Sequence, residues 1–139
     1  MSGYKAFASF VNYMSDSLEP HGITVVTEKD DALQPPYVVL QAGPDDIRNQ
    51  WLSALLCQGW VVVAKQSTEP LAVTIGKAVD TVLSVSTDPG QLAKYDYTSD
   101  PPVQIGTFIV KAREVTQDMS TDPLRARKVI TWELNSNSK

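Results

Sequence analysis

The chain has 139 residues, of which 42% are hydrophobic, 20% charged and 8% aromatic. These values are those of an ordinary globular protein of one domain, and they exclude an unfolded tail or a collagen-like repeat. With 12 basic and 16 acidic residues the formal net charge is −4, which argues against a domain whose whole surface attracts phosphate.

The N-terminal segment predicts an amphipathic helix. Apolar residues recur there at helical spacing on one stripe, namely Tyr4, Phe7, Phe10, Val11, Met14 and Leu18. We expect this stripe to face the core rather than a membrane, because Lys5 is the one positive charge on the opposite side. The segment is not of signal-peptide type, and no run reaches the roughly 18 apolar residues of a membrane span. We therefore expect a soluble protein that is made in the cytoplasm.

Three strands are expected in the first half of the chain. Residues 23–27 are short and β-branched, and residues 60–65 have strong strand propensity. The run Tyr37-Val38-Val39-Leu40-Gln41-Ala42-Gly43 follows two prolines and is typical of a strand that is buried on both faces. We expect it to be a central strand.

Residues 45–58 are ambiguous. The spacing of Ile47, Trp51 and Leu55 favours a helix that is capped by Asp45 or Asp46. The alternative is a long strand that begins near Trp51 and continues into residues 60–65. The helix is the preferred prediction.

A second helix is expected over residues 69–85. Thr68-Glu69-Pro70 supplies a capping side chain, an acid and a first-turn proline, and an apolar face follows. Asp88-Pro89-Gly90 ends this helix. Residues 91–102 are then expected to form a loop of a length that is often functional.

The C-terminal part predicts a β-hairpin. Phe108, Val110 and Ala112 alternate with polar residues, and the return strand alternates in the same way around Ile130 and Trp132. Residues 135–139 are expected to be a frayed tail. The whole order predicts one α+β domain over residues 1–139. We expect a single layer of mixed or antiparallel sheet of about four or five strands, with two or three helices mainly on one face.

Candidates for chemistry are few. The single cysteine, Cys57, lies in an apolar stretch and is expected to be a small buried hydrophobe, with a reactive thiol as the alternative. The single histidine, His21, lies in a Pro/Gly turn. Two acidic pairs, at residues 30–31 and 45–46, are expected at turns and helix starts rather than as acid/base pairs. We predict no catalytic residue, no metal site, no cofactor and no enzymatic activity.

The charge is unevenly distributed along the chain. Residues 1–100 carry 12 acids and 6 bases, whereas residues 101–139 carry 4 acids and 6 bases. We expect the predicted hairpin to form a cationic ribbon in which two basic groups face each other; its members are Lys111, Arg113, Arg125, Arg127 and Lys128. Lys128 falls on the side of the alternation that is expected to face the core. Either a bulge shifts the register there, or Lys128 lies beyond the area that the core covers. The ribbon is either a solvated face or a contact with a subunit or with phosphate.

Four features together carry a resemblance to a known family. They are the aromatic helix Tyr4 to Leu18, the strand Pro36-Tyr37-Val38-Val39-Leu40, the junction from Val61 to Pro70, and the closing strand Val129-Ile130-Thr131-Trp132-Glu133-Leu134. This order of elements resembles the tail terminator, or tail completion and neck, proteins of long-tailed bacteriophages. The features span most of the chain but are architectural, so no contact residue of the family is carried over by position. The helix formers in residues 45–59 depart from the family pattern.

The resemblance implies a structural virion protein of the tail or neck. Such proteins form a ring, usually a hexamer, that caps the tail tube, stops its polymerisation and provides the surface that joins the head. The partners implied are further copies of the chain, the tail tube protein and head-tail connector proteins, with no membrane. DNA would pass through the channel without specific binding, repelled by carboxylates on the wall, while the five cations would contact a subunit or the tube.

Three other functions stay open on the residues alone. The chain could be another neck or connector component. It could be a small enzyme with a pocket lined by Tyr95, Tyr97, His21 or the acidic pairs. It could also be a monomeric binding module. The mass of the native particle separates the ring from the last two, and a deep pocket that perturbs the pKa of an acid or of His21 would favour the enzyme.

Overall fold

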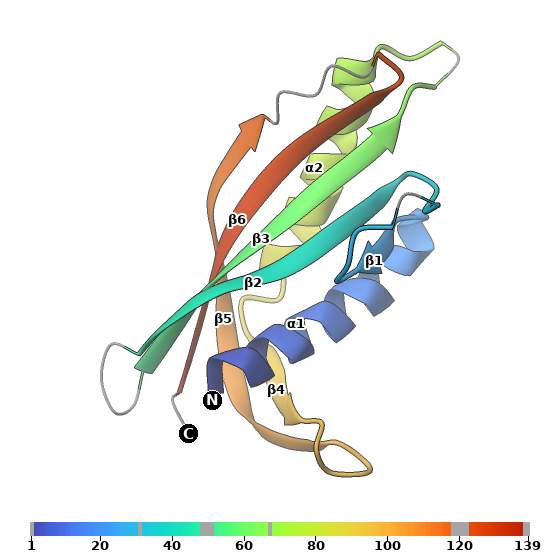
Figure 1. The fold of residues 1–139 in the computed structure, drawn as a ribbon. Helices are drawn as coiled ribbons and strands as arrows, with labels where there is room; N and C mark the ends of the chain where they lie inside the picture. Colours follow the sequence, from blue (N-terminus) through green and yellow to red (C-terminus); the bar gives the residue numbers. More distant parts are fainter. Residues whose placement is uncertain (1, 31, 48–51, 67, 118–122, 138–139) are drawn as a thin grey trace.

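The computed structural model describes residues 2–30, 32–47, 52–66, 68–117 and 123–137 (Figure 1). It contains two α-helices, one short 3₁₀ helix and six strands among these residues. In chain order they are α1 (Ser2–Leu18), η1 (Glu19–His21), β1 (Thr24–Val26), β2 (Tyr37–Ile47), β3 (Leu52–Ala64), α2 (Leu71–Thr87), β4 (Leu92–Asp96), β5 (Val103–Gln117) and β6 (Arg125–Asn137).

All six strands belong to one curled, mixed sheet. Its strand order is β1-β2-β3-β6-β5-β4, and β1 and β2 are parallel while every other neighbouring pair is antiparallel. The fold is therefore mostly β, and the predicted α+β class is wrong, while the predicted four or five strands come close to the six described. Two α-helices do fall within the predicted number, and both lie where the apolar spacing placed them.

The predicted helix over residues 45–58 is wrong. β2 runs through Asp45 and Asp46 to Ile47, and β3 begins at Leu52 and pairs with β2 in antiparallel register; residues 48–51 lie outside the described part. The helical spacing of Ile47 and Leu55 was coincidental, because strand alternation sends Leu55 and Cys57 into the core and leaves Leu56 exposed on the other face. The alternative of a strand that continues into residues 60–65 is confirmed.

Two further predictions fail in the second half of the chain. The expected loop over residues 91–102 contains β4, whose Leu92 and Lys94 are buried on the side where α1 packs. The tail expected to fray at residue 135 is paired through Asn137 with Leu52 of β3, because the long β3 supplies a partner for the whole of β6. The C-terminal hairpin is confirmed as the antiparallel pair of β5 and β6.

The core lies between the helices and one face of the sheet. Trp132 of β6 is fully buried there, with its ring centroid 5.2 Å from that of Phe10 on α1. The Trp132 Nε1–H donates a hydrogen bond of 3.0 Å to Ser86 Oγ on α2, which in turn donates to the carbonyl of Leu83. Gly59 of β3 makes room for this ring, because a Cβ at that position would come within 2.6 Å of it. One indole thus joins both helices to the sheet.

A smaller apolar cluster lies on the opposite face of the sheet. Tyr37 and Val39 of β2 and Val62 of β3 are buried there, with Leu33 of the β1–β2 connection packed against them. β2 is accordingly buried on both faces from Tyr37 to Leu40, but Gln41 and Ala42 are exposed, so the prediction of two-sided burial for residues 37–43 holds only for the first four. No helix among the described residues is long and apolar enough to cross a membrane.

Candidate functional site

The first predicted basic group lies beside a buried acid on the sheet face opposite the helices. Glu133 lies in the middle of β6 with its side chain 5% exposed, and Arg113 Nη1 of β5 lies 3.0 Å from its carboxylate. Lys111 is the direct cross-strand neighbour of Glu133. Arg113 occupies a bulge between Ala112 and Glu114, which gives the guanidinium its reach across to β6. This group is therefore partly a local ion pair.

The second predicted basic group lies at the start of β6. Arg125, Arg127 and Lys128 are half-buried and pair in register with Ala64, Val62 and Val61 of β3. The prediction that the two groups face each other is wrong, since Lys111 is opposite Glu133 while Lys128 is opposite Gln117. Lys128 keeps the core-side parity of Ile130, and the register between β6 and β3 has no shift. A bulge that moves Lys128 off the core side is therefore wrong, because the irregularity of the hairpin lies in β5, between Ala112 and Glu114.

The β5–β6 hairpin is exposed mainly along β5, whereas its β6 strand continues the sheet beside β3. Every residue of β5 from Lys111 to Gln117 is exposed, and this stretch carries both charge and apolar area. Val115 is 41% exposed, and Leu124, just before β6, is 64% exposed. Exposed aliphatic side chains among cations are typical of protein contact surfaces. Residues 118–122, which connect the two strands, lie outside the described part.

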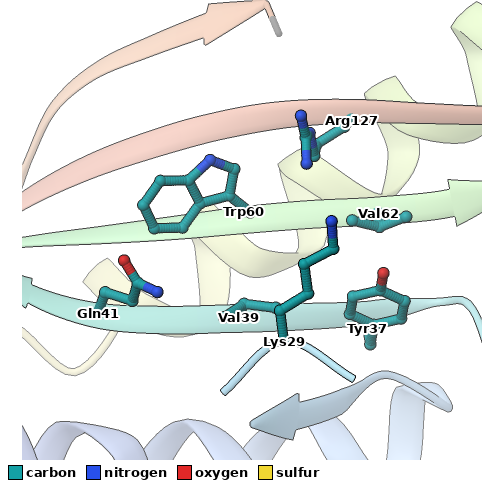
Figure 2. A pocket seen from close by; sticks show the side chains of 7 residues that line it. All are labelled: Lys29, Tyr37, Val39, Gln41, Trp60, Val62 and Arg127. Carbon is teal, nitrogen blue, oxygen red and sulfur yellow. The ribbon is translucent and has the colours of Figure 1, made fainter. Parts of the chain in front are cut away.

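A hollow of about 220 Å³ lies on the face opposite the helices, and its lining joins three strands and one loop (Figure 2). It is lined by Lys29, Tyr37, Val39, Gln41, Trp60, Val62 and Arg127. Figure 2 shows the Lys29 side chain reaching over Val39 toward Arg127, with the indole of Trp60 beside them. Two cations next to flat apolar walls suit an anionic group that is attached to an aromatic or aliphatic body.

The sequence did not reveal this hollow, although it did single out Arg127. The signal that could have found it is the strand parity of Tyr37 and Trp60, which places both aromatics on the face opposite Leu40 and Cys57. The contribution of Lys29 depends on the fold of the β1–β2 connection, which no local pattern specifies.

The thiol predicted to be buried is buried. Cys57 lies on the helix side of β3 with no exposed surface, and burial raises its pKa to about 12. A neutral thiol without solvent access is a poor nucleophile. His21 is exposed in η1, at the rim of a shallow hollow beside α2. The two residues lie on different elements, one buried and one solvated.

The remaining candidates have local roles. Asp30 accepts a hydrogen bond from the backbone N–H of Ala32 in a turn, as expected, while Asp31 lies outside the described residues. Asp45 and Asp46 belong to a strand rather than to a helix start. Tyr95 and Tyr97 lie together, with ring centroids 6.1 Å apart. Among the described residues, no group of three or more His, Cys, Asp or Glu side chains could hold a metal ion.

The most unusual titratable group is on β4. Lys94 is 1% exposed and packs on the helix side of the sheet, where α1 carries Lys5. Burial, and then the like charge of Lys5, lower the pKa of Lys94. Its neighbour Asp96 pairs with Lys5 at 3.7 Å, and hydrogen bonds from Thr98 lower the pKa of that carboxyl. These charges join α1 to the margin of the sheet, and Lys94 lies away from the hollow.

Comparison of the chain with protein-family models and with curated proteins found no match. The proposal of a function therefore rests on the surfaces of this chain, above all the β5–β6 hairpin and the margins of the sheet.

Proposed function

We propose that the chain is a non-catalytic structural protein of a tailed-phage virion. Its copies would form a ring, with six as the expected number, that caps the tail tube, ends tube polymerisation and joins the tail to the head. The observation that carries the proposal is the hairpin extension from Lys111 to Gln117 and from Leu124 to Lys128. Its β5 strand is exposed from Lys111 to Gln117, and together with Leu124 it offers cations and exposed aliphatic side chains to a neighbouring protein.

The uneven charge supports this function. The first 100 residues carry twice as many acids as bases, whereas the hairpin is basic. A ring whose channel wall is lined by the acidic body would repel DNA phosphates and let the genome pass without adhesion. The cationic hairpin would then be directed at protein, where an acidic surface of the tube or of a neighbouring subunit complements it.

The test is the mass of the native particle together with a tube-length assay. We expect particles of about six times 15.2 kDa and tail tubes that stop growing when the protein is added. The double variant Lys111→Gln with Arg125→Gln should weaken capping. Its matched control is Lys5→Gln with Lys77→Gln, which removes two cations from the helices. A protein that stays monomeric and leaves tube length unchanged would overturn the proposal.

A second candidate, a monomeric binding module, is favoured by the hollow that Lys29 and Arg127 line. Phenyl phosphate is a suitable probe because it joins an anion to a flat apolar ring. Saturable binding to a 15.2 kDa monomer, weakened by Trp60→Ala, would favour this module over the ring.

A further inference from the structure

Among the described residues, two strands of the sheet have long stretches with no strand on their outer side. β1 pairs with β2 over Tyr37–Val39, which leaves residues 40–47 of β2 on the margin of the sheet within the described chain. β4 pairs with β5 over Val103–Phe108, which leaves residues 109–117 of β5 on the other margin. An open strand edge presents backbone N–H and C=O groups to any strand that approaches it, and Pro44 in the β2 stretch contributes only its C=O.

These two free stretches lie at the same height on opposite margins. The register runs straight across the sheet from Leu40 through Gly59 and Ile130 to Val115, and in the next rows from Ala42 to Ala112. The strand directions alternate from β2 to β5, so the two margins run antiparallel to each other. A second copy of the chain, set alongside in the same orientation, therefore presents its β2 antiparallel to the β5 of the first copy.

The short outer strands fit this arrangement. β1 covers the end of β2 that is level with Val62 and Arg127, and β4 covers the opposite end of β5, level with Ser53 and Ser136. The outer strands thus cover opposite ends of the two margins. When two copies lie side by side, a small shift of one copy along the strand direction keeps its β1 clear of the end of β5 in the other copy.

The charges of the two margins are complementary by sequence. β2 carries Asp45 and Asp46 near its end, whereas the free stretch of β5 contains Lys111 and Arg113 beside one acid, Glu114. The same small shift sets residues 45 and 46 level with this basic part of β5. Ile109 and Val115, both more than 40% exposed, lie on the same free stretch and would be covered by the neighbour.

We propose that residues 40–47 of one copy pair antiparallel with residues 109–117 of the next, so that the sheet continues from subunit to subunit. The contact joins two different surfaces and is head-to-tail, which generates rings or filaments rather than two-fold dimers. This inference deepens the proposed ring and rests on it for the closure of the assembly. The occupant of each margin is a second copy of this chain.

Cysteine cross-linking tests the contact directly. Ala42→Cys and Glu114→Cys place single thiols on the two margins, and a mixture of the two variants should give linked pairs with a short bismaleimide. The double variant should give a ladder that ends at the ring. The native chain, with Cys57 as its one thiol, is the blank, and Asp16→Cys on α1 with Glu114→Cys is the control that should not link.

A second pair of variants tests the contribution of the margin to assembly. Ile109→Lys with Val115→Lys places lysines on the free stretch of β5 and should raise the concentration for half-assembly at least about tenfold. Tyr4→Lys with Val73→Lys replaces equally exposed apolar residues on the helices and should leave it unchanged. Circular dichroism checks that both double variants stay folded.

The outcomes separate this inference from the ring function. Rings that cap tubes but give no ladder, and that withstand the β5 lysines, would overturn the edge pairing and leave the ring function standing. A ladder without any effect on tube growth would keep the edge pairing and overturn the capping function. A monomer without a ladder would overturn both.

Discussion

The two faces of the sheet differ sharply although the same strands form both. On β3, Leu55 and Cys57 face the helices and have no exposed surface, while Leu56 between them is 42% exposed on the other face. On β6, Trp132 is sealed under both helices, while the adjacent Glu133 is held by an arginine that is itself mostly exposed. Stability is thus concentrated on the helix face, and the other face and the margins keep surface for partners.

Trp132→Ala should produce the largest effect on this comparison. The change removes the indole that contacts Phe10 and Ser86, and we expect the free energy of unfolding to fall by about 3–5 kcal/mol. Leu56→Ala, on the open face of the neighbouring strand, should cost less than about 1 kcal/mol. Urea denaturation measures both losses of unfolding free energy. Equal losses would contradict the claim that stability is concentrated on the helix face of the sheet.

Gly59→Ala should cause the next largest loss of stability. The new Cβ would lie 2.6 Å from the ring of Trp132, which is fully enclosed and has little room to move. We expect a loss of about 1–3 kcal/mol from overpacking. Gly76→Ala on α2 is the matched control, because a Cβ there would point into open space and alanine favours a helix by roughly 0.5–1 kcal/mol. Thermal unfolding should therefore move in opposite directions for the two variants.

Arg113→Ala examines the open face. It removes the guanidinium 3.0 Å from the buried Glu133 carboxylate, and we expect a cost of about 1 kcal/mol because Arg113 itself is more than half exposed. The double variant with Glu133→Gln should recover part of that loss in denaturant titrations. A loss as large as that of Trp132→Ala would place a main part of the stability on this face.

The smallest effect concerns pH and the margin near α1. Because the folded pKa of Lys94 lies below its ordinary value of 10.5, the unfolded chain binds more protons over the window below that value, and stability should rise with pH there. Lys94→Met should flatten this rise. Urea midpoints at about pH 8 and about pH 10 measure the rise in stability. An equal rise in the native chain and in Lys94→Met would show that Lys94 contributes nothing to the pH dependence.

The sequence predicted the elements whose periodicity was unbroken. The stripe from Phe10 to Leu18 and the alternation around Trp132 are long enough to indicate their type and buried side. It failed at residues 45–58 because strand residues separated by four can mimic a helical face. It also missed β4, since the polar-looking sequence around Lys94 and Tyr95 becomes a strand through pairing with β5 and contact with α1, a long-range effect.

The surface was less predictable than the core. The five cations were visible as a cluster in the sequence, but the hairpin register decides that Lys111 meets Glu133. The hollow around Trp60 and the open margins arise from pairs of strands that are distant in sequence. Such features depend on the lengths of β1 and β4 relative to their neighbours, and those lengths are set by where the turns fall.

Cys57 has a practical consequence for following this molecule. Its thiol is sealed between β3 and the helices, with its pKa raised to about 12, so a disulfide reagent reaches it only when that layer opens. The rate of labelling under native conditions therefore reports the frequency of opening at the centre of the sheet. Cys57 therefore allows the opening of the native sheet to be followed without introducing a new cysteine.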